Sequence, residues 1–281
     1  MYFYILDQGK QSIEKFERLY IELQSLLNEF NISGEMARVT PLRSLSDCIE
    51  TASLRGVKTL VVCGSDDTFN LVLAQLKGRD FTVAFIPTTP SESYLAGILG
   101  LTNLRIAVKT IAARRIERLD MAQAGPVFFI SWLEFGVTSQ NIRHMGLWAS
   151  IKLLTAPGKA LTVRIDNSYD LDLSCLGGLV VNSRSTTAFN EALANPTDGF
   201  LDLLIMEKLS SYDVLRFKKD IANGILEKVP RTSVIKCKRL DFLEPEGMSL
   251  TISGKVMVKA PVSVEIIPKR LKLIVGKART F

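Results

Sequence analysis

The sequence is poor in residues that build metal and redox centres. Its 281 residues include one histidine, His144, and four cysteines, none of which forms a Cys-x-x-Cys pair. A zinc centre needs several imidazole or thiolate ligands, so a site with two or three histidines within one chain is excluded. Any hydrolase triad would have to use the single imidazole. Cysteines with this spacing are typical of a reducing cytosol, and we expect them to be free buried thiols.

Long apolar runs are also missing. The densest run, residues 127–133, already includes Ser131 and ends at Glu134, far short of the roughly 18 consecutive apolar residues of a membrane span. No basic segment precedes the strand-like residues 1–7, which argues against a secretion signal. We therefore expect a cytoplasmic protein. Its mean hydropathy of +0.19 predicts either a strongly buried core or an apolar surface region.

The excess of positive charge is small. With 35 basic and 29 acidic side chains the net charge is +6, which permits anionic partners without requiring them. We expect no nucleic-acid partner, because the basic residues are not interleaved with aromatic ones. The last thirteen residues contain five basic residues and no acidic residue. Their alternating pattern predicts an exposed edge strand, while a peripheral contact with acidic lipid headgroups is the alternative.

Strand-like and helix-like segments alternate over the first 118 residues. Residues 2–6 predict a short strand, and apolar residues then recur every three or four positions from Ile13 to Phe30, as in an amphipathic helix. Continuous apolar runs at 59–63 and 82–86 are typical of strands buried on both faces of a parallel sheet. Further helices are predicted at residues 45–52, 69–76 and 92–99. The pattern predicts a doubly wound parallel α/β domain over residues 1–118.

After Arg118 the predicted elements become short and rich in β-forming residues. They are interrupted by one helical segment at about 212–226, and no linker separates them from the first region. The pattern predicts a β-sandwich or barrel packed directly against the first domain. The predicted strands are residues 127–132, 161–165, 176–181, 201–206, 234–237, 249–252, 256–258 and 262–267.

The turn at residues 64–68 lies between a predicted buried strand and a helix, where α/β folds bind their ligands. Backbone N–H groups at a helix start can hold a phosphate, Gly64 permits close approach, and Thr68 offers a hydroxyl. Asp66 and Asp67 oppose this, because carboxylates repel an anion unless magnesium or a donor network stands between them. An equally open alternative is that Asp66 or Asp67 only caps the helix.

Three segments, in this order, resemble motifs of the superfamily of diacylglycerol kinases, sphingosine kinases and NAD kinases. LVVCGSDDTFNLV (60–72) resembles the family's GGDGT-x-N-E-V segment. FIPTTPSESYLAGILGL (85–101) resembles I-P-x-G-T-x-N-D-x-A-x-x-L-G, and NPTDGFLDLLIM (195–206) resembles P-x-A-x-x-x-D-G-x-L-D-V-x-I, as in the lipid kinase branch. VVNSRSTTAF (180–189) stands where the family has an asparagine followed by a glycine-rich loop.

The resemblance implies a two-domain kinase that uses ATP and magnesium to phosphorylate a lipid hydroxyl. Its nucleotide domain would comprise residues 1–118 with residues 269–281 returning to it, and its β-sandwich substrate domain residues 119–268. Asp198 would accept the proton of the attacking hydroxyl, Asp202 would support it, and Asp66 is the candidate magnesium ligand. Asn182 and Arg184 would border the site. The implied nucleotide contacts are Gly64, Ser65, Asp66, Asp67, Thr68, Asn70, Thr89, Glu92 and Ser93.

The motifs depart from the family at several positions. Ser65 and Asp67 replace glycines, Leu71 replaces a glutamate, and Pro90 has no N–H to donate to a phosphate. These changes leave two hypotheses, a divergent lipid kinase and a catalytically inactive family member that binds a lipid, a nucleotide or a partner. NAD kinase activity is a third alternative, and whether the chain forms a homodimer stays open.

Overall fold

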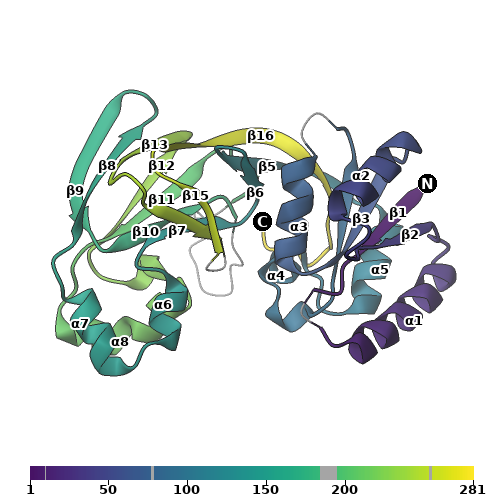
Figure 1. The fold of residues 1–281 in the computed structure, drawn as a ribbon, viewed down its shortest axis with the longest axis horizontal. Coiled ribbons are helices and arrows are strands. Elements are labelled where there is room, and N and C mark those ends of the chain that lie inside the picture. Colours follow the sequence, from purple (N-terminus) through teal and green to yellow (C-terminus); the bar gives the residue numbers. More distant parts are fainter. Residues whose placement is uncertain (10, 77–78, 184–194, 253–254) are drawn as a thin grey trace. The chain divides into compact units, whose positions relative to one another are not determined.

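The computed structural model describes residues 1–9, 11–76, 79–183, 195–252 and 255–281 (Figure 1). Packing of the backbone divides them into two units, which are described separately. The first contains Met1–Asp120 and Pro268–Phe281, and the second contains Met121–Ser183 and residues 195–267. Among the described residues, no helix is both long and apolar enough to span a bilayer.

The first unit is built on a parallel sheet. Its strands are β1 (Tyr2–Leu6), β2 (Glu35–Arg38), β3 (Thr59–Gly64) and β4 (Thr82–Pro87), in the order β2-β1-β3-β4. The end of β16 (Val262–Ile274) adds a further parallel strand beside β4. Every residue of β3 and β4 is buried, because helices cover both faces of the sheet. The predicted doubly wound α/β fold is confirmed.

In the described part of this unit five α-helices surround the sheet, and each begins with a side-chain cap. The caps are serine or asparagine side chains, which accept a hydrogen bond from a backbone N–H of the first turn. Helix α1 packs against α5, and α2 packs against α3. The helices are α1 (Ile13–Glu29), α2 (Leu45–Leu54), α3 (Asp66–Gln75), α4 (Tyr94–Leu99) and α5 (Leu104–Ala113).

Two of the predicted helices differ from the observed ones in their bounds. Helix α3 begins at Asp66 rather than at Phe69, because Ser65 caps it. The helix predicted over 92–99 is divided into a 3-10 turn (Pro90–Glu92) and α4, since Ser93 ends the turn and caps the next helix. Helix α5 was not predicted.

The second unit contains two antiparallel sheets packed face to face. One has the order β12-β11-β10-β7-β14-β15, and the other joins β16, β13, β8 and β9, with β5 and β6 pairing at its side. The predicted β-sandwich is confirmed. Its strands are β5 (Ile116–Ala124), β6 (Val127–Phe129), β7 (Trp132–Gly136), β8 (Lys159–Ile165), β9 (Tyr169–Cys175), β10 (Gly177–Val181), β11 (Leu201–Met206), β12 (Thr232–Cys237), β13 (Arg239–Glu244), β14 (Ser249–Ile252) and β15 (Lys255–Lys259).

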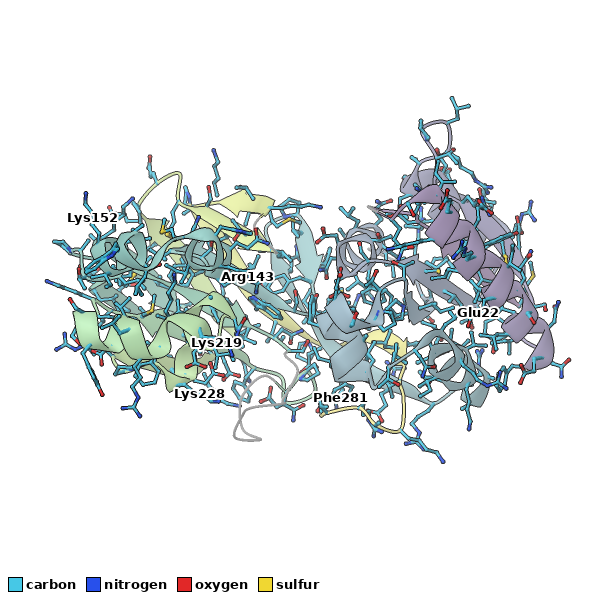
Figure 2. All side chains as sticks on the ribbon, turned by 90° about the horizontal axis from the view of Figure 1, so that it is seen from below. Glu22, Arg143, Lys152, Lys219, Lys228 and Phe281 are labelled. Atoms are coloured by element: carbon cyan, nitrogen blue, oxygen red, sulfur yellow. The ribbon has the colours of Figure 1, made fainter. Side chains whose placement is uncertain are left out.

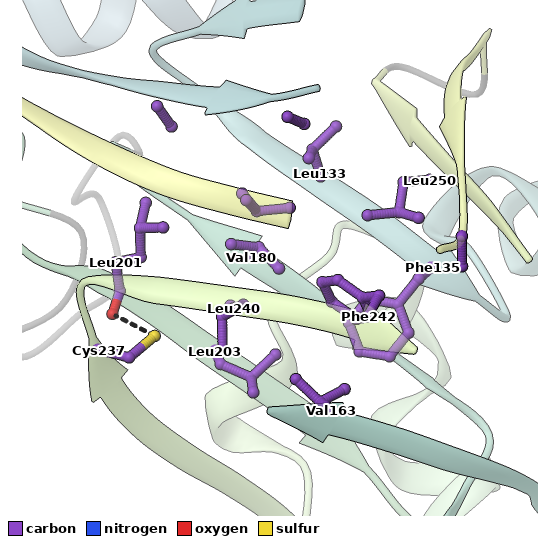
Figure 3. Packing of buried hydrophobic residues seen from close by; sticks show 14 of the residues in the cluster. Leu133, Phe135, Val163, Val180, Leu201, Leu203, Cys237, Leu240, Phe242 and Leu250 are labelled. Atoms are coloured by element: carbon purple, nitrogen blue, oxygen red, sulfur yellow. Dashed lines mark hydrogen bonds between the residues drawn. The ribbon is translucent and has the colours of Figure 1, made fainter. Parts of the chain in front are cut away.

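The sandwich core lies between these sheets (Figure 3). The rings of Phe135 and Phe242 meet edge to face with their centres 5.2 Å apart. Cys237 also lies in this core, where burial raises the pKa of its thiol to about 12. All four cysteines are free and buried, as expected. They act as small apolar side chains here, not as nucleophiles.

A helical layer covers the other face of β10 and β11. It consists of α6 (Ser139–His144), α7 (Leu147–Leu154), α8 (Ser211–Ala222) and a 3-10 turn (Leu226–Lys228). A second apolar core lies beneath it, formed by strand residues together with residues of these helices. The predicted helical interruption at 212–226 corresponds to α8 and the turn, whereas α7 was not predicted.

The basic C-terminal segment is not an exposed edge strand, contrary to the prediction. The last part of β16 pairs with β4 through Lys272 and Leu273, and β5 also pairs with β16. Lys272 forms an ion pair with Asp80 at 2.7 Å, and Arg279 forms one with Glu117 at 2.5 Å. These basic side chains therefore have partners within the first unit.

Candidate functional site

Three loops of the first unit meet at the carboxyl ends of β1, β3 and β4. Their described residues are 7–9, 11, 64–68 and 88–93, and they are neighbours because their strands are adjacent in the sheet. The side-chain amide of Gln11 donates to the carbonyl oxygen of Thr88 at 2.8 Å and to the hydroxyl of Thr89 at 3.0 Å. The sequence-predicted nucleotide contacts all lie in or directly after these loops.

The turn at Gly64 is tightly built. A Cβ atom at Gly64 would lie 2.9 Å from the Cβ of Thr68, so the backbone has no room for a side chain there. The hydroxyl of Ser65 accepts from the backbone N–H of Thr68 at 3.2 Å and thereby caps α3. The Thr68 hydroxyl donates to a carboxylate oxygen of Asp7 at 2.5 Å. Ser65 and Thr68 therefore both have a local structural role.

Asp66 joins the β3 loop to the start of α4. Its carboxylate accepts from the hydroxyl of Ser93 at 2.5 Å and from the backbone N–H of Tyr94 at 2.9 Å. Burial raises the pKa of this carboxyl to about 6, although hydrogen bonds from Ser93 and from the backbone of Tyr94 and Leu95 act in the opposite direction. Asp66 and Ser93, predicted from separate motifs, are thus brought into direct contact.

Asp66, the predicted magnesium ligand, already has hydrogen-bond partners in this structure. Both of its oxygens accept hydrogen bonds, and burial favours its protonated form. Over the described residues there is no group of three histidine, cysteine or carboxylate side chains that could hold a metal ion. Mg²⁺ often takes only one or two protein carboxylates together with substrate phosphates and water. Asp67, half-buried on the same turn, is the carboxylate that fits this mode.

Two further predicted contacts differ in exposure. Asn70 is buried on α3, where its amide nitrogen donates to the hydroxyl of Tyr94 at 3.3 Å. Its side-chain oxygen is buried without a hydrogen-bond partner among the described groups. Glu92 is exposed, and its backbone N–H donates to the carbonyl oxygen of Thr89 within the 3-10 turn. Asn70 therefore supports the loops from beneath, while Glu92 faces solvent.

The three loops are acidic. In the sequence they contain four acidic residues and one basic residue, Lys10. Two of the acidic residues, Asp66 and Asp67, occupy the first turn of α3, where they already interact favourably with the helix dipole. A bare anion would meet repulsion here, and a divalent cation bound to a nucleotide would reduce that repulsion.

Asp198, the predicted catalytic base, lies in the second unit before β11. One carboxylate oxygen accepts from the backbone N–H of Phe200 at 3.0 Å, and the other is 2.7 Å from the ammonium nitrogen of Lys236 on β12. This partner raises the pKa of Lys236. The ammonium group of Lys236 also lies 6.0 Å from the centre of the Phe200 ring. The Asp198 carboxylate is therefore ion-paired and fixed in orientation.

The remaining predicted residues also belong to the second unit. Asp202 is buried on β11, opposite Lys236 on β12. Asn182 is buried at the end of β10, and its side-chain amide donates to the carbonyl oxygen of Ile130 at 3.3 Å. Arg184 lies outside the described residues. The structure thus places Asp198 and Asp202 around one lysine, and the nucleotide contacts in the other unit.

The sequence interpretation missed three residues of these sites. Asp7 directly follows β1, just as Gly64 ends β3, so the rule that ligands bind at the carboxyl ends of parallel strands could have identified it. Gln11 follows in the same loop. Lys236 could not be identified from the sequence, because it comes close to Asp198 only through the pairing of β11 with β12.

Two family models match the chain. The diacylglycerol kinase catalytic domain matches residues 8–124, and the YegS C-terminal NAD kinase beta sandwich-like domain matches residues 191–275. No curated protein matches the sequence.

Solved structures from Bacillus anthracis str. Sterne have the same fold over almost the whole chain. One, a diacylglycerol kinase, is 16% identical to this chain with a TM-score of 0.73. The alignment covers 99% of this chain and 97% of that protein's chain. Another, named provisionally as a diacylglycerol kinase, is 15% identical with a TM-score of 0.75 and the same coverage. At this identity the likeness concerns the fold alone.

Proposed function

Because the chain belongs to the diacylglycerol kinase family with its NAD kinase-like β-sandwich, we propose that it transfers the terminal phosphoryl group of ATP to the hydroxyl of a diacylglycerol-type lipid. The observation that carries this proposal is the turn at Gly64–Thr68, which joins a fully buried parallel strand to a capped helix. Such a turn presents backbone N–H groups to a phosphate.

In this proposal the first unit binds the nucleotide. Backbone N–H groups of Asp66 and Asp67 face the phosphates, and Thr89, held by Gln11, closes the opposite loop. Asp67 would hold the magnesium ion of the nucleotide, which neutralises phosphate charge when bound. Asp66 acts as a positioning residue, because it fixes the β3 loop to the start of α4.

The second unit supplies the proton acceptor. Asp198 accepts the proton of the attacking lipid hydroxyl, and Lys236 orients its carboxylate from 2.7 Å. Phosphoryl transfer depends mainly on positioning and on neutralising charge, so these groups form a sufficient set.

The direct test is a transfer assay with labelled ATP, magnesium and diacylglycerol dispersed in detergent. We expect labelled phosphatidic acid, and Asp198→Asn should lower the rate by about a hundredfold or more, because general-base catalysis contributes that much. Asp170→Asn is the matched control, since Asp170 is an exposed, ion-paired carboxylate of the same unit. NAD is included as a second acceptor, and formation of NADP in place of phosphatidic acid would overturn the lipid assignment.

A second candidate function is binding without turnover. It is favoured because Asp66 and Asp198 already have hydrogen-bond or ion-pair partners. An inactive family member would be stabilised by ATP with magnesium, because binding to the native state alone raises the melting temperature. Stabilisation without any product would support this candidate, whereas product formation that depends on Asp198 would exclude it.

A further inference from the structure

Helix α7 turns its largest side chain toward solvent. Trp148 is 83% exposed and Leu147 is 43% exposed, whereas Ser150 and Leu154 on the same helix are buried. Residues four apart lie on one helix face, so Trp148 and Lys152 share the face opposite to Ser150 and Leu154. The outer face of α7 therefore combines an indole ring with an ammonium group.

Helix α8 has an outer face of the same kind. Tyr212, Leu215, Arg216 and Lys219 are all exposed, and they recur at the spacing of a single helix face. Tyr212 is 68% exposed and Leu215 is 56% exposed, while Val214 faces the apolar core beneath the helix. Helices α7 and α8 pack against each other. We call the six exposed residues the helical face: Trp148, Lys152, Tyr212, Leu215, Arg216 and Lys219.

Positive charge surrounds the helical face. Residues 139–154, which comprise α6, α7 and the turn between them, contain the basic residues Arg143 and Lys152 and no acidic residue. Helix α8 adds three basic residues against two acidic ones. Figure 2 looks onto this layer and shows Arg143, Lys152 and Lys219 distributed over it. An apolar surface with basic residues around it matches an anionic lipid surface.

Helix α1 of the first unit provides a comparison. Ile13 and Ile21 are 70% and 66% exposed, so α1 also presents apolar side chains to solvent. However, α1 contains four glutamates and only two basic residues, and it has no tryptophan. Exposed apolar side chains are common by themselves. The combination of aromatic rings with excess positive charge distinguishes the helical face from α1.

We propose that the helical face docks the protein onto the surface of an anionic lipid bilayer. The proposal rests on the proposed function, since a lipid kinase must meet its substrate at a membrane. Trp148 and Tyr212 suit the interface, where aromatic rings with a polar edge accumulate. Arg216 and Lys219 attract acidic headgroups, and each such charge strengthens binding roughly fivefold. A second copy of this face is a poorer partner, because two positively charged surfaces repel.

Vesicle binding tests this proposal without nucleotide. The background variant is Trp132→Phe, because Trp148 is then the only tryptophan. We expect sedimentation with vesicles of equal parts phosphatidylcholine and phosphatidylglycerol but not with phosphatidylcholine alone, and a shift of Trp148 emission to shorter wavelength. The double variant Arg216→Gln/Lys219→Gln should lower binding by about 25-fold. Ile21→Ala on α1 is the matched control and should bind like the parent. If Trp132→Phe does not fold, vesicle sedimentation of the protein with both tryptophans still tests the binding, because this assay does not depend on fluorescence.

Three outcomes would overturn the proposal. The first is a lack of binding to anionic vesicles, and the second is binding that persists unchanged in the double variant. The third is an emission shift that appears without vesicles as the protein concentration rises, which would indicate a second copy as the partner. Activity on a short-chain, detergent-dispersed diacylglycerol separates the two proposals. Turnover without vesicle binding rejects only the docking, and vesicle binding without turnover rejects only the kinase.

Discussion

Asp66 and Asp198, one carboxylate in each unit, are stabilised in opposite ways. Asp66, in the first unit, is largely buried and accepts hydrogen bonds from neutral donors, the Ser93 hydroxyl and the backbone N–H of Tyr94. Asp198, in the second unit, is partly exposed and faces the ammonium group of Lys236. Burial raises the pKa of a carboxyl when its hydrogen-bond donors are neutral. An ion pair that is partly exposed to water, in contrast, contributes little to the free energy of unfolding. The difference predicts that Asp66 links folding to pH, and that the ion pair of Asp198 adds little stability.

The largest expected effect is the pH dependence from Asp66. Its pKa is about 6 in the folded protein against the ordinary 3.8, so the folded state retains a proton that the unfolded state has already released. The contribution of Asp66 to the free energy of unfolding should therefore fall by up to about 3 kcal/mol as the pH rises from 4 to above 6. Asp66→Asn cannot ionise and should lack this loss. Urea denaturation of both proteins across this range measures the difference, and parallel curves would contradict the prediction.

Ser93→Ala should have the next largest effect. The Ser93 hydroxyl donates to Asp66 and also accepts from the backbone N–H of Ala96 to cap α4. Losing both should lower the free energy of unfolding by about 2 kcal/mol. Ser91→Ala, an exposed neighbour, serves as the control. If urea denaturation gave equal values for the two variants, the link between the β3 loop and α4 would be without energetic importance.

Lys236→Gln should have the smallest effect on stability. The side chains of Lys236 and Asp198 are 42% and 24% exposed, and such ion pairs contribute at most about 1 kcal/mol. Raising the salt concentration should reduce the difference from the parent protein further, while the effect of Ser93→Ala should persist. Thermal unfolding at low and high salt measures the stability change of each variant. A large loss of stability in Lys236→Gln that does not depend on salt would contradict the prediction.

The sequence predicted those parts of the fold whose signal is local. Strands β3 and β4 are largely apolar runs bounded by turns, β11 is apolar except for Asp202, and the positions of all three were predicted nearly to the residue. Helices α6 and α7 have six and eight residues, too few for a clear periodicity, and α7 was missed. Helix α5 has the regular spacing of a longer helix and an asparagine cap, so its signal was present but was not used.

The candidate site could likewise be predicted only where its signal in the sequence is local. Gly64, Asp66 and Ser93 could be placed together because each follows a buried parallel strand, and such ends meet at one edge of a sheet. Their roles as ligands stay predictions. The partners of the carboxylates could not be predicted, since the Ser93–Asp66 contact spans 27 residues and the Lys236–Asp198 contact spans 38.

Strand β16 has a consequence for the order in which the protein is made. Its first residues pair with β13 in the second unit, and Lys272 and Leu273 pair with β4 in the first. The first unit therefore begins ahead of the sandwich in the chain but receives its last strand only after the whole sandwich has been synthesised. A nascent chain that stops before residue 268 would leave β4 with an uncovered edge, a surface on which unfinished chains associate.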